Sequence, residues 1–306
     1  MEQNTHAFFE GKIVPFGDAK ISIAAHGLNY GTAAFAGLRG YWNADKKKLY
    51  VFRPYDHYKR FLNSAKILAM QFPHTPESLT KITIDLLKAD NWQQDVYIRP
   101  LCYKADAGIG VRLHDLRDEI SIFAIAFGAY GKNEDGAHVT ISSWRRVDDN
   151  VIPARGKISG AYANSALIKT DAIRAGFDEA LVLDQNGHIS EGTAMNVFMV
   201  RDGVLITPPV YDNILEGITR RTIIELAKNE LGLTVAERSI DRTEAMACEE
   251  LFLTGTAAQV MVVTKMDFRP IGDGKMGPIT AKLRDLFNDV VHGKHEKYNH
   301  WNVPVE

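Results

Sequence analysis

One lysine stands in an unusual setting in the stretch ARGKISGAYANS, which runs from Ala154 to Ser165. Lys157 directly follows Gly156 and lies close to Gly160, just where a helix is expected to begin. Its small neighbours leave the amine open to whatever approaches. A lysine amine forms a Schiff base with a carbonyl compound when a dry or cationic setting lowers its pKa. The simpler alternative is a solvated loop lysine, which is the usual position of this residue type.

Three other segments carry groups that a carbonyl cofactor such as pyridoxal phosphate needs. The stretch EGITRR (Glu216–Arg221) is a glycine turn that leads into a helix, and a helix start binds phosphate well. The stretch LTGTAAQ (Leu253–Gln259) ends an apolar strand in a small-residue turn whose amides are able to face a ligand. Glu191, in HISEGTAMNVF, is a carboxylate able to hold the proton of a pyridine ring. Each segment alone is equally typical of an ordinary helix start, strand-end loop or solvated carboxylate.

Other familiar chemistries lack their motifs. No GxGxxG follows an expected strand, and neither a P-loop nor a GxSxG motif is present. Cys102 and Cys248 form no CxxC pair, which excludes a zinc ribbon and a thioredoxin-like motif. His292, His295 and His300 gather near the C-terminus in a segment more typical of a solvated tail than of a metal site. The motifs therefore assign no metal ligand.

Composition indicates a two-domain globular protein. With 306 residues the chain is too long for one ordinary core, and 45% hydrophobic with 24% charged residues is typical of globular proteins. The formal net charge of −2 gives no reason to expect a nucleic-acid partner. The N-terminus lacks a signal-peptide pattern, and the longest apolar run, Ile120–Phe127, is too short to span a bilayer. Because two cysteines fit a reducing compartment, we expect a cytoplasmic protein without a membrane partner.

Expected strands and helices alternate irregularly along the chain. One hairpin is expected to turn at Glu10–Gly11 and a second at Asn43–Asp45, and helices are expected to begin at Pro54 and Pro76. Beyond them we expect strands DVYIRPLCY, EISIFAIAF and VTISSW, the helix of the lysine segment, hairpins EALVLDQNGHISEG and MNVFMVRDGVLIT, a helix from Gly217, the strand ELFLTG and a closing helix from Pro278. The absence of a clean βαβ rhythm favours an α+β fold over a doubly wound sheet.

Taken together and in this order, the lysine segment, SEG…N-F, GITR and TGTAA resemble the class IV pyridoxal-phosphate aminotransferases, and within them the branched-chain amino acid aminotransferases. The resemblance extends from HGLNYGTAAFAGLRGY to GPIT, nearly the whole chain. It implies the two-domain architecture of fold type IV: a small N-terminal domain like an α/β sandwich, a larger C-terminal domain with a barrel-like sheet, and pyridoxal 5′-phosphate between them. The polar, glycine-rich stretch 128–137 is the expected interdomain loop, so the domains would be 1–127 and 138–306.

The resemblance assigns the cofactor-binding roles residue by residue. Lys157 would hold the cofactor as a Schiff base and then act as the base that moves the proton. Glu191 would pair with the pyridinium nitrogen. Tyr162, one turn along the same expected helix as Lys157, would bond the phenolate oxygen. The phosphate would be held by Arg53, Ile218, Thr219 and Thr256.

The resemblance also assigns two carboxylate-binding roles. Tyr97 and Arg99 alternate with Ile98 on an expected strand and so point to one face. The Tyr97 hydroxyl would receive the substrate α-carboxylate together with the amides of Thr256 and Ala257. Arg99 would take the distal carboxylate of glutamate, helped by Tyr30 and Tyr130.

An apolar wall for leucine, isoleucine and valine is implied as well, and it would consist of Phe35, Gly37, Phe127 and Val111. Val111 is expected from the partner subunit. The resemblance therefore implies a homodimer, or a larger homo-oligomer built from dimers.

The implied activity is transamination between branched-chain L-amino acids and 2-oxoglutarate, a step of branched-chain amino-acid biosynthesis. Three residues depart from the family pattern and leave the substrate range open: Ala36 replaces a usual glutamate, Ala161 an asparagine and Ala194 a glycine. The alternatives are a transaminase for D-amino acids or (R)-amines, an enzyme with both activities, and an aminodeoxychorismate-type lyase. A two-domain ligand-binding protein without catalysis is the non-enzyme alternative.

Overall fold

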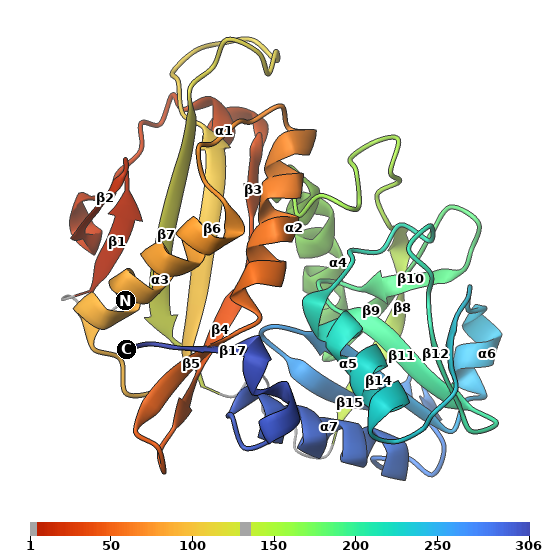
Figure 1. The fold of residues 1–306 in the computed structure, drawn as a ribbon. Coiled ribbons are helices and arrows are strands. Elements are labelled where there is room, and N and C mark those ends of the chain that lie inside the picture. The colour runs from red at the N-terminus through yellow and green to blue at the C-terminus, as the bar shows by residue number, and fades with distance from the viewer. Residues whose placement is uncertain (1–4, 129–135) are drawn as a thin grey trace. The chain divides into compact units, whose positions relative to one another are not determined.

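The computed structural model describes residues 5–128 and 136–306 (Figure 1). The chain divides into two compact units, each with its own sheet and hydrophobic core. Unit 1 consists of residues 1–128, 156–161 and 289–306, and unit 2 consists of residues 129–155 and 162–288. No helix in the described part of the chain is both long and apolar enough to cross a membrane.

Unit 1 is built on an eight-stranded sheet whose strand pairs are all antiparallel among the described residues. The strands are β1 (His6–Phe9), β2 (Lys12–Pro15), β3 (Ala33–Phe35), β4 (Leu38–Asn43), β5 (Lys48–Phe52), β6 (Val96–Lys104), β7 (Asp118–Ala126) and β17 (Asn302–Pro304). The helices of this part are η1 (Phe16–Asp18), α1 (His26–Tyr30), α2 (Pro54–Ile67), α3 (Pro76–Asp90), η2 (Ser159–Ala161) and η3 (Glu296–Trp301).

Local signals in the sequence explain the elements of unit 1. Glu10 and Gly11 both have positive φ angles, 48° and 80°, as the tight turn between β1 and β2 requires. Thr75 and Ser78 form a capping box at the start of α3. Helices α2 and α3 pack against each other, α2 contacts β3, and α3 contacts β1 and β7 (Figure 1). The apolar residues of both helices, among them Tyr58, Phe61, Leu79 and Leu86, therefore lie in the core beneath the sheet.

Unit 2 is built on a nine-stranded mixed sheet. Its strands are β8 (Ala137–Arg145), β9 (Glu179–Leu183), β10 (Ile189–Gly192), β11 (Asn196–Arg201), β12 (Val204–Thr207), β13 (Val235–Glu237), β14 (Glu250–Gly255), β15 (Gln259–Met266) and β16 (Arg269–Pro270). The helices are α4 (Tyr162–Arg174), α5 (Ile218–Asn229), α6 (Arg242–Met246) and α7 (Pro278–Val291), whose last residues belong to unit 1. Helix α4 packs on β8 and β9, and α5 packs on β13 and β14 (Figure 1).

The GPIT segment begins α7 through a contact with β14. The Glu250 carboxylate accepts hydrogen bonds from the amides of Ile279 and Thr280, at 3.0 and 2.7 Å. A carboxylate at a helix start satisfies amides that have no partner inside the helix. A Cβ atom at Gly277 would lie only 2.1 Å from the carboxyl carbon of Glu250. Glycine is therefore required there because the carboxylate occupies the place of a side chain.

The structure confirms the α+β fold class. The nine-stranded sheet runs from β10 to β13 and curls like half of a barrel (Figure 1). The division into domains 1–127 and 138–306 stays a prediction, because compact units defined by contacts need not be folding domains. Most of the expected loop 128–137 lies outside the described residues. Residues 156–161, which carry Lys157, group with unit 1, and so does the segment 289–306.

Two local expectations were wrong. The second hairpin turns at residues 44–47, because Asn43 still pairs with Lys48 as the last residue of β4. Lys157 and Tyr162 do not share a helix: Lys157 lies between a turn and the bridge residue Ile158, a short 3₁₀ turn follows, and α4 begins only at Tyr162. The small residues that suggested an early helix instead allow close backbone approach.

Candidate active site

The lysine segment adds to the edge of strand β3 in unit 1. The Phe35 amide donates to the Lys157 carbonyl at 3.0 Å, and Ile158 forms an antiparallel bridge with Ala34. The Lys157 amide donates to the hydroxyl of Ser64, a fully buried residue of α2, at 3.1 Å. Backbone pairing on one side and a helix on the other fix the position from which the Lys157 side chain extends.

A glycine pair lets the chain come this close. Gly31, in the left-handed conformation at the end of α1, has a φ angle of 67°. A Cβ atom there would lie 2.9 Å from the Cα atom of Gly160, and the Gly160 amide donates to the Gly31 carbonyl at 3.3 Å. Both the conformation and the contact exclude a side chain at Gly31. The glycine beside the lysine therefore serves backbone packing.

One aromatic ring contacts two cations in unit 1. The Lys157 Nζ atom lies 5.0 Å from the centre of the Phe35 ring, and the Arg99 guanidinium carbon lies 4.4 Å from it. Both distances are in the range of cation–π contacts. Arg99 also donates to the Tyr97 hydroxyl at 3.2 Å, which confirms that Tyr97 and Arg99 share one face of β6.

The Arg99 guanidinium keeps a donor in reserve. Its Nε atom is buried and has no hydrogen-bond partner within the described residues. A buried donor without a partner is costly, so a site of this kind favours an anionic ligand. Phe35 and Tyr97 thus hold the Arg99 guanidinium, while its Nε donor remains able to bind an anionic ligand.

Gly37 and Phe127 adjoin Tyr97. A Cβ atom at Gly37 would lie 2.0 Å from the Tyr97 hydroxyl oxygen, so only glycine leaves room for this side chain. The Phe127 ring packs against the Tyr97 ring with centres 5.3 Å apart. These contacts join Gly37, Tyr97 and Phe127 to the group around Phe35 and Arg99.

Tyr30 and Val111 form a separate group in unit 1. The Tyr30 hydroxyl accepts a hydrogen bond from the Gly110 amide at 3.0 Å, and the neighbouring Val111 side chain is 81% exposed. The two expected site residues therefore belong to one surface. Tyr130 lies outside the described residues.

Arg53 is held at the start of α2. Its backbone has positive φ and ψ angles, 46° and 45°, and its amide donates to the Trp301 carbonyl at 2.6 Å. The guanidinium lies over the Trp301 ring at 4.5 Å and donates from Nε to Asp56 at 2.6 Å. A left-handed non-glycine residue persists only when its surroundings hold it. Trp301, nearly at the C-terminus, supplies that support.

Glu191 is a buried acidic side chain of unit 2 with several partners. It is 4% exposed and lies in β10, directly after an irregularity in the pairing of β10 with β9. Such bulges redirect side chains. Its Oε1 atom pairs with the Arg146 guanidinium at 2.9 Å. Its Oε2 atom accepts from Asn196 Nδ2 at 3.2 Å and from the Leu215 amide at 3.0 Å. A carboxylate bound by three donors is kept in a fixed orientation.

Asn196 joins Glu191 to the loop before α5. Its amide nitrogen also donates to the Leu215 carbonyl at 2.8 Å. A Cβ atom at Gly217 would lie 2.1 Å from the Asn196 Oδ1 atom, so glycine is required at this place. The SEG…N-F and EGITR segments therefore meet through side-chain contacts that fix the start of α5.

The start of α5 offers amides to a ligand. Gly217 is the N-cap and makes no side-chain capping bond; Ile218 and Thr219 follow and are buried. Uncapped amides at a helix start favour an anion. Thr256 and Ala257 lie in the turn between β14 and β15, where Gly255 pairs with Gln259. Tyr162, the first residue of α4, is half-buried.

The structure distributes the expected residues over the chain's two units. Lys157, Phe35, Gly37, Tyr97, Arg99 and Phe127 form one connected group in unit 1, with Arg53 and the Tyr30–Val111 pair elsewhere in that unit. Unit 2 contains Tyr162, Glu191, Ile218, Thr219, Thr256 and Ala257.

Sequence reasoning missed the side chains that hold the chemical groups. Arg146, Ser64 and Trp301 each contact an expected site residue from a distant part of the chain. The Arg pair in SSWRR carried no signal that one arginine pairs with Glu191. Asn196 did carry one, because it is part of the quoted SEG…N-F pattern.

The departures from the family pattern have different surroundings. Ala36 is 1% exposed and belongs to the core of unit 1, whereas Ala194 is exposed in the turn before β11. Ala161 ends the short 3₁₀ turn before α4.

Comparison with known proteins finds relatives and solved structures that match nearly the whole chain. Residues 42–266 match the family model described as amino-transferase class IV. A probable branched-chain-amino-acid aminotransferase of Aquifex aeolicus is 46% identical, over 98% of this chain and 96% of that protein. The crystal structure of the Thermoproteus uzoniensis branched-chain aminotransferase with norvaline has a TM-score of 0.94 and 40% identity, over 99% of both chains. The T.th. branched-chain amino acid aminotransferase complexed with N-(5′-phosphopyridoxyl)-L-glutamate has a TM-score of 0.94 and 38% identity, over 100% of both chains.

The Arg146–Glu191 pair generates a stability prediction. Replacing Arg146 with Met leaves Glu191 buried without its cation, which costs about 3–5 kcal/mol in free energy of unfolding. Arg155→Met is the matched control: Arg155 is 49% exposed and lies 3.4 Å from the exposed Glu216, so its loss costs at most about 1 kcal/mol. Denaturant unfolding measures both. The double variant Arg146→Met/Glu191→Gln should recover part of the loss, because no uncompensated charge remains. Equal losses in the two single variants would contradict the assignment.

Proposed function

The chain belongs to the class IV aminotransferases, and from this membership we propose that it exchanges the amino group of branched-chain L-amino acids with 2-oxoglutarate, using pyridoxal 5′-phosphate as cofactor. Leucine, isoleucine and valine give branched 2-oxo acids, and 2-oxoglutarate becomes L-glutamate. The relative from Aquifex aeolicus carries the name of this activity. The norvaline and phosphopyridoxyl-glutamate complexes of the structural neighbours contain an unbranched amino acid and a glutamate derivative of the cofactor.

The observation that carries the proposal is the Phe35 ring with its two cations. An enzyme that accepts both leucine and glutamate needs an apolar surface beside the reacting lysine and a cation for the second carboxylate. Phe35 contacts the Lys157 amine on one hand and the Arg99 guanidinium on the other. Arg99 retains an unpartnered buried Nε donor within the described residues. A dicarboxylic amino acid bound at Lys157 is therefore within the reach of a fixed cation.

The residues present fit pyridoxal phosphate. The pyridinium nitrogen needs a fixed carboxylate, and Glu191 is buried and held by Arg146, Asn196 and the Leu215 amide. The phosphate needs uncapped amides, and the start of α5 at Ile218 and Thr219 offers them. When bound, the cofactor supplies an electron sink for the carbanion formed at the substrate's α-carbon. Arg53, Thr256 and the hydroxyl of Tyr162 complete the proposed set, the first two at the phosphate and Tyr162 at the phenolate oxygen.

Lys157 has two roles in the proposal. Its amine would hold the cofactor at the carbonyl carbon and, once released, would carry the α-proton of the amino acid to that carbon, across the nitrogen that lies between them. The backbone contacts with Phe35 and Ser64 keep the amine in place through both steps. The α-carboxylate is assigned to the Tyr97 hydroxyl and to the amides of Thr256 and Ala257. The apolar side chains rest on Phe35, Gly37, Phe127 and Val111.

We include a homodimer in the proposal because two neighbouring segments, residues 23–28 and 108–111, form an exposed apolar patch that contains Val111. Its members are Ile23, Leu28, Ile109 and Val111, which are 87%, 59%, 95% and 81% exposed. The two segments lie side by side: Gly108 donates to the Ala24 carbonyl, and the His26 ring contacts the Gly110 carbonyl at 2.8 Å. Apolar groups this exposed favour a protein partner. Tyr30 is bonded to the same loop, so Tyr30 and Val111 would reach the partner's site together.

A cytoplasmic location also stays a proposal. Both cysteines are free and buried, and burial raises the pKa of each thiol to about 12. Thiols of this kind are unreactive and fit a reducing compartment.

The first prediction from this function concerns Lys157. Borohydride reduction of the cofactor-loaded protein should attach the cofactor to Lys157, as peptide mapping by mass spectrometry will show. Lys157→Ala should still bind the cofactor through the Glu191 and α5 groups, but without a covalent bond, and transamination should nearly disappear. Lys81→Ala, a lysine of α3 that is 76% exposed, is the control and should behave like the wild type. Attachment to another lysine would overturn the mechanism.

The second prediction concerns Arg99. Arg99→Met keeps most of the bulk and removes the charge-assisted hydrogen bond, worth roughly 1.5–3 kcal/mol, or about 10- to 150-fold. kcat/KM for glutamate and 2-oxoglutarate should fall by that factor, while the leucine half-reaction in single turnover changes only a fewfold. For Arg99→Lys, kcat/KM for glutamate and 2-oxoglutarate should lie between the values of the wild type and Arg99→Met. Equal losses for leucine and glutamate would assign Arg99 to the α-carboxylate. A panel of L-amino acids, D-amino acids and (R)-amines with the wild type tests the stereochemistry; preference for the D or R series would refute the proposed function.

The third prediction concerns the partner's contribution to the site. Val111→Arg and Lys157→Ala should each be nearly inactive alone. When the two variants are co-expressed, a mixed dimer has one site with Lys157 from one chain and Val111 from the other, so roughly a quarter of the wild-type activity should return. If Val111 serves the site of its own chain, no activity returns on mixing. Sedimentation velocity checks that both variants still form dimers.

A further inference from the structure

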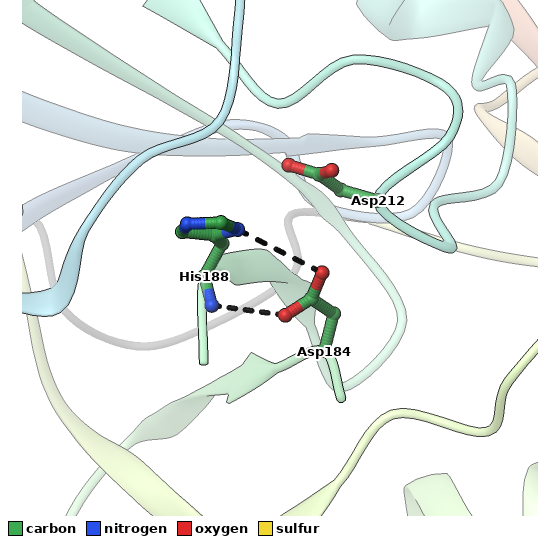
Figure 2. A group of neighbouring side chains, drawn as sticks. All are labelled: Asp184, His188 and Asp212. Carbon is green, nitrogen blue, oxygen red and sulfur yellow. Dashed lines mark hydrogen bonds and ion pairs between the residues drawn. The ribbon is translucent and has the colours of Figure 1, made fainter. Parts of the chain in front are cut away.

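Three side chains of unit 2 outside the proposed active site are arranged like metal ligands. Asp184 directly follows β9, His188 precedes β10, and Asp212 lies in the loop between β12 and α5. One ligand atom from each lies within 4.8 Å of the other two, the one such group found in the described part of the chain. Figure 2 shows the His188 ring beside the Asp184 carboxylate, with the Asp212 carboxylate directed toward both.

The two carboxylates are buried, and one oxygen has no donor. Asp184 is 1% exposed and Asp212 is 3% exposed. The side chain of Ser239 hydrogen-bonds Asp212, yet the Asp212 Oδ2 atom has no hydrogen-bond partner among the described residues. A buried carboxylate oxygen without a partner is strongly disfavoured, so this atom favours a cationic ligand.

The turn between β9 and β10 orients the other two side chains. Asp184 Oδ1 accepts from the amides of Asn186 and His188, both at 2.9 Å, which fixes the carboxylate. Figure 2 shows the bond from the His188 amide. The His188 Nδ1 atom lies 4.0 Å from Asp184 Oδ2, and its Nε2 atom lies 3.6 Å from Asp241 Oδ1. Metal-binding histidines commonly have a carboxylate near the second ring nitrogen.

We propose that Asp184, His188 and Asp212 bind a divalent transition-metal cation, with Zn²⁺ as the best fit, and that Asp241 supports the His188 ring. The imidazole nitrogen excludes the hard cations Mg²⁺ and Ca²⁺, which prefer an all-oxygen set. Two carboxylates neutralise the charge of Zn²⁺, and water completes a tetrahedral site. Zinc ligands lie about 2.0–2.2 Å from the metal and hence roughly 3.5 Å from one another, so the side chains converge by about 1 Å on binding.

The cation has a structural role in this proposal. It joins the 184–188 turn to the loop that contains Asp212. That loop also contains Leu215, whose amide donates to Glu191 at 3.0 Å, and Asn213, whose carbonyl accepts from Arg146 at 3.2 Å. A metal at Asp212 therefore stabilises the same loop that positions Glu191, without contacting the reacting groups.

The test measures Zn²⁺ binding by the full-length, cofactor-loaded protein. After chelator treatment and gel filtration, isothermal titration with Zn²⁺ should show that the wild type binds one equivalent. In Asp212→Asn and in His188→Gln the affinity for Zn²⁺ should be at least about 100-fold lower. Asp241→Asn should weaken binding by about 10- to 100-fold. His114→Ala, an exposed histidine of unit 1, is the control and should change nothing.

Stability supplies an independent measurement. Zn²⁺ at a free concentration about 100 times its Kd should multiply the ratio of folded to unfolded wild-type protein by about 100, and this gain should be absent in Asp212→Asn. Mg²⁺ and Ca²⁺ should give no gain. The proposal is overturned if Zn²⁺ binds the wild type and both ligand variants equally, or if the wild type takes up no Zn²⁺ at millimolar concentration. In the latter case the three side chains make polar contacts only with one another and with their protein neighbours.

Discussion

The backbone of the lysine segment is the constraint on which the rest of the proposed site depends. Two hydrogen bonds fix the backbone of Lys157: its carbonyl accepts from the Phe35 amide, and its amide donates to the Ser64 hydroxyl. In the turn that follows, the Gly160 amide donates to the Gly31 carbonyl. An amine on a flexible loop would sample many positions, whereas this one extends from a paired strand edge. Positioning of this kind is a large part of what an enzyme contributes to a rate, because the reacting groups are brought together before the reaction begins.

Charged groups in this chain are held by neighbours that carry no reactive chemistry. Glu191 is bound by Arg146, Asn196 and a backbone amide, and Arg53 is bound by Asp56 and lies over the Trp301 ring. The Arg146–Glu191 ion pair orients the Glu191 carboxylate more than it stabilises the fold, since removing water from both charges offsets much of their attraction. A buried charge with fixed partners keeps its orientation when substrates of different polarity enter.

Small residues in the motifs act by what they leave out. The Cβ atoms missing from Gly31, Gly37 and Gly217 would lie 2.9, 2.0 and 2.1 Å from Gly160, Tyr97 and Asn196. Each glycine therefore admits one specific neighbour: a backbone, a phenol or an amide. In the sequence these glycines suggest unusual backbone conformations. At two of the three positions, however, glycine is required because a side chain would not fit, since only Gly31 has a positive φ angle.

The sequence by itself determined the α+β class, most strand and helix positions, the shared face of Tyr97 and Arg99, and the family. These depend on local periodicity, caps and turns, and on motif order, all of which lie within short stretches. Only the tertiary structure decided that Lys157 pairs with a strand edge ahead of the helix, that Arg146 holds Glu191, and that Asp212 meets Asp184 and His188. Partners in these contacts are tens of residues apart, and neither burial nor pairing between distant segments is encoded in any one of them.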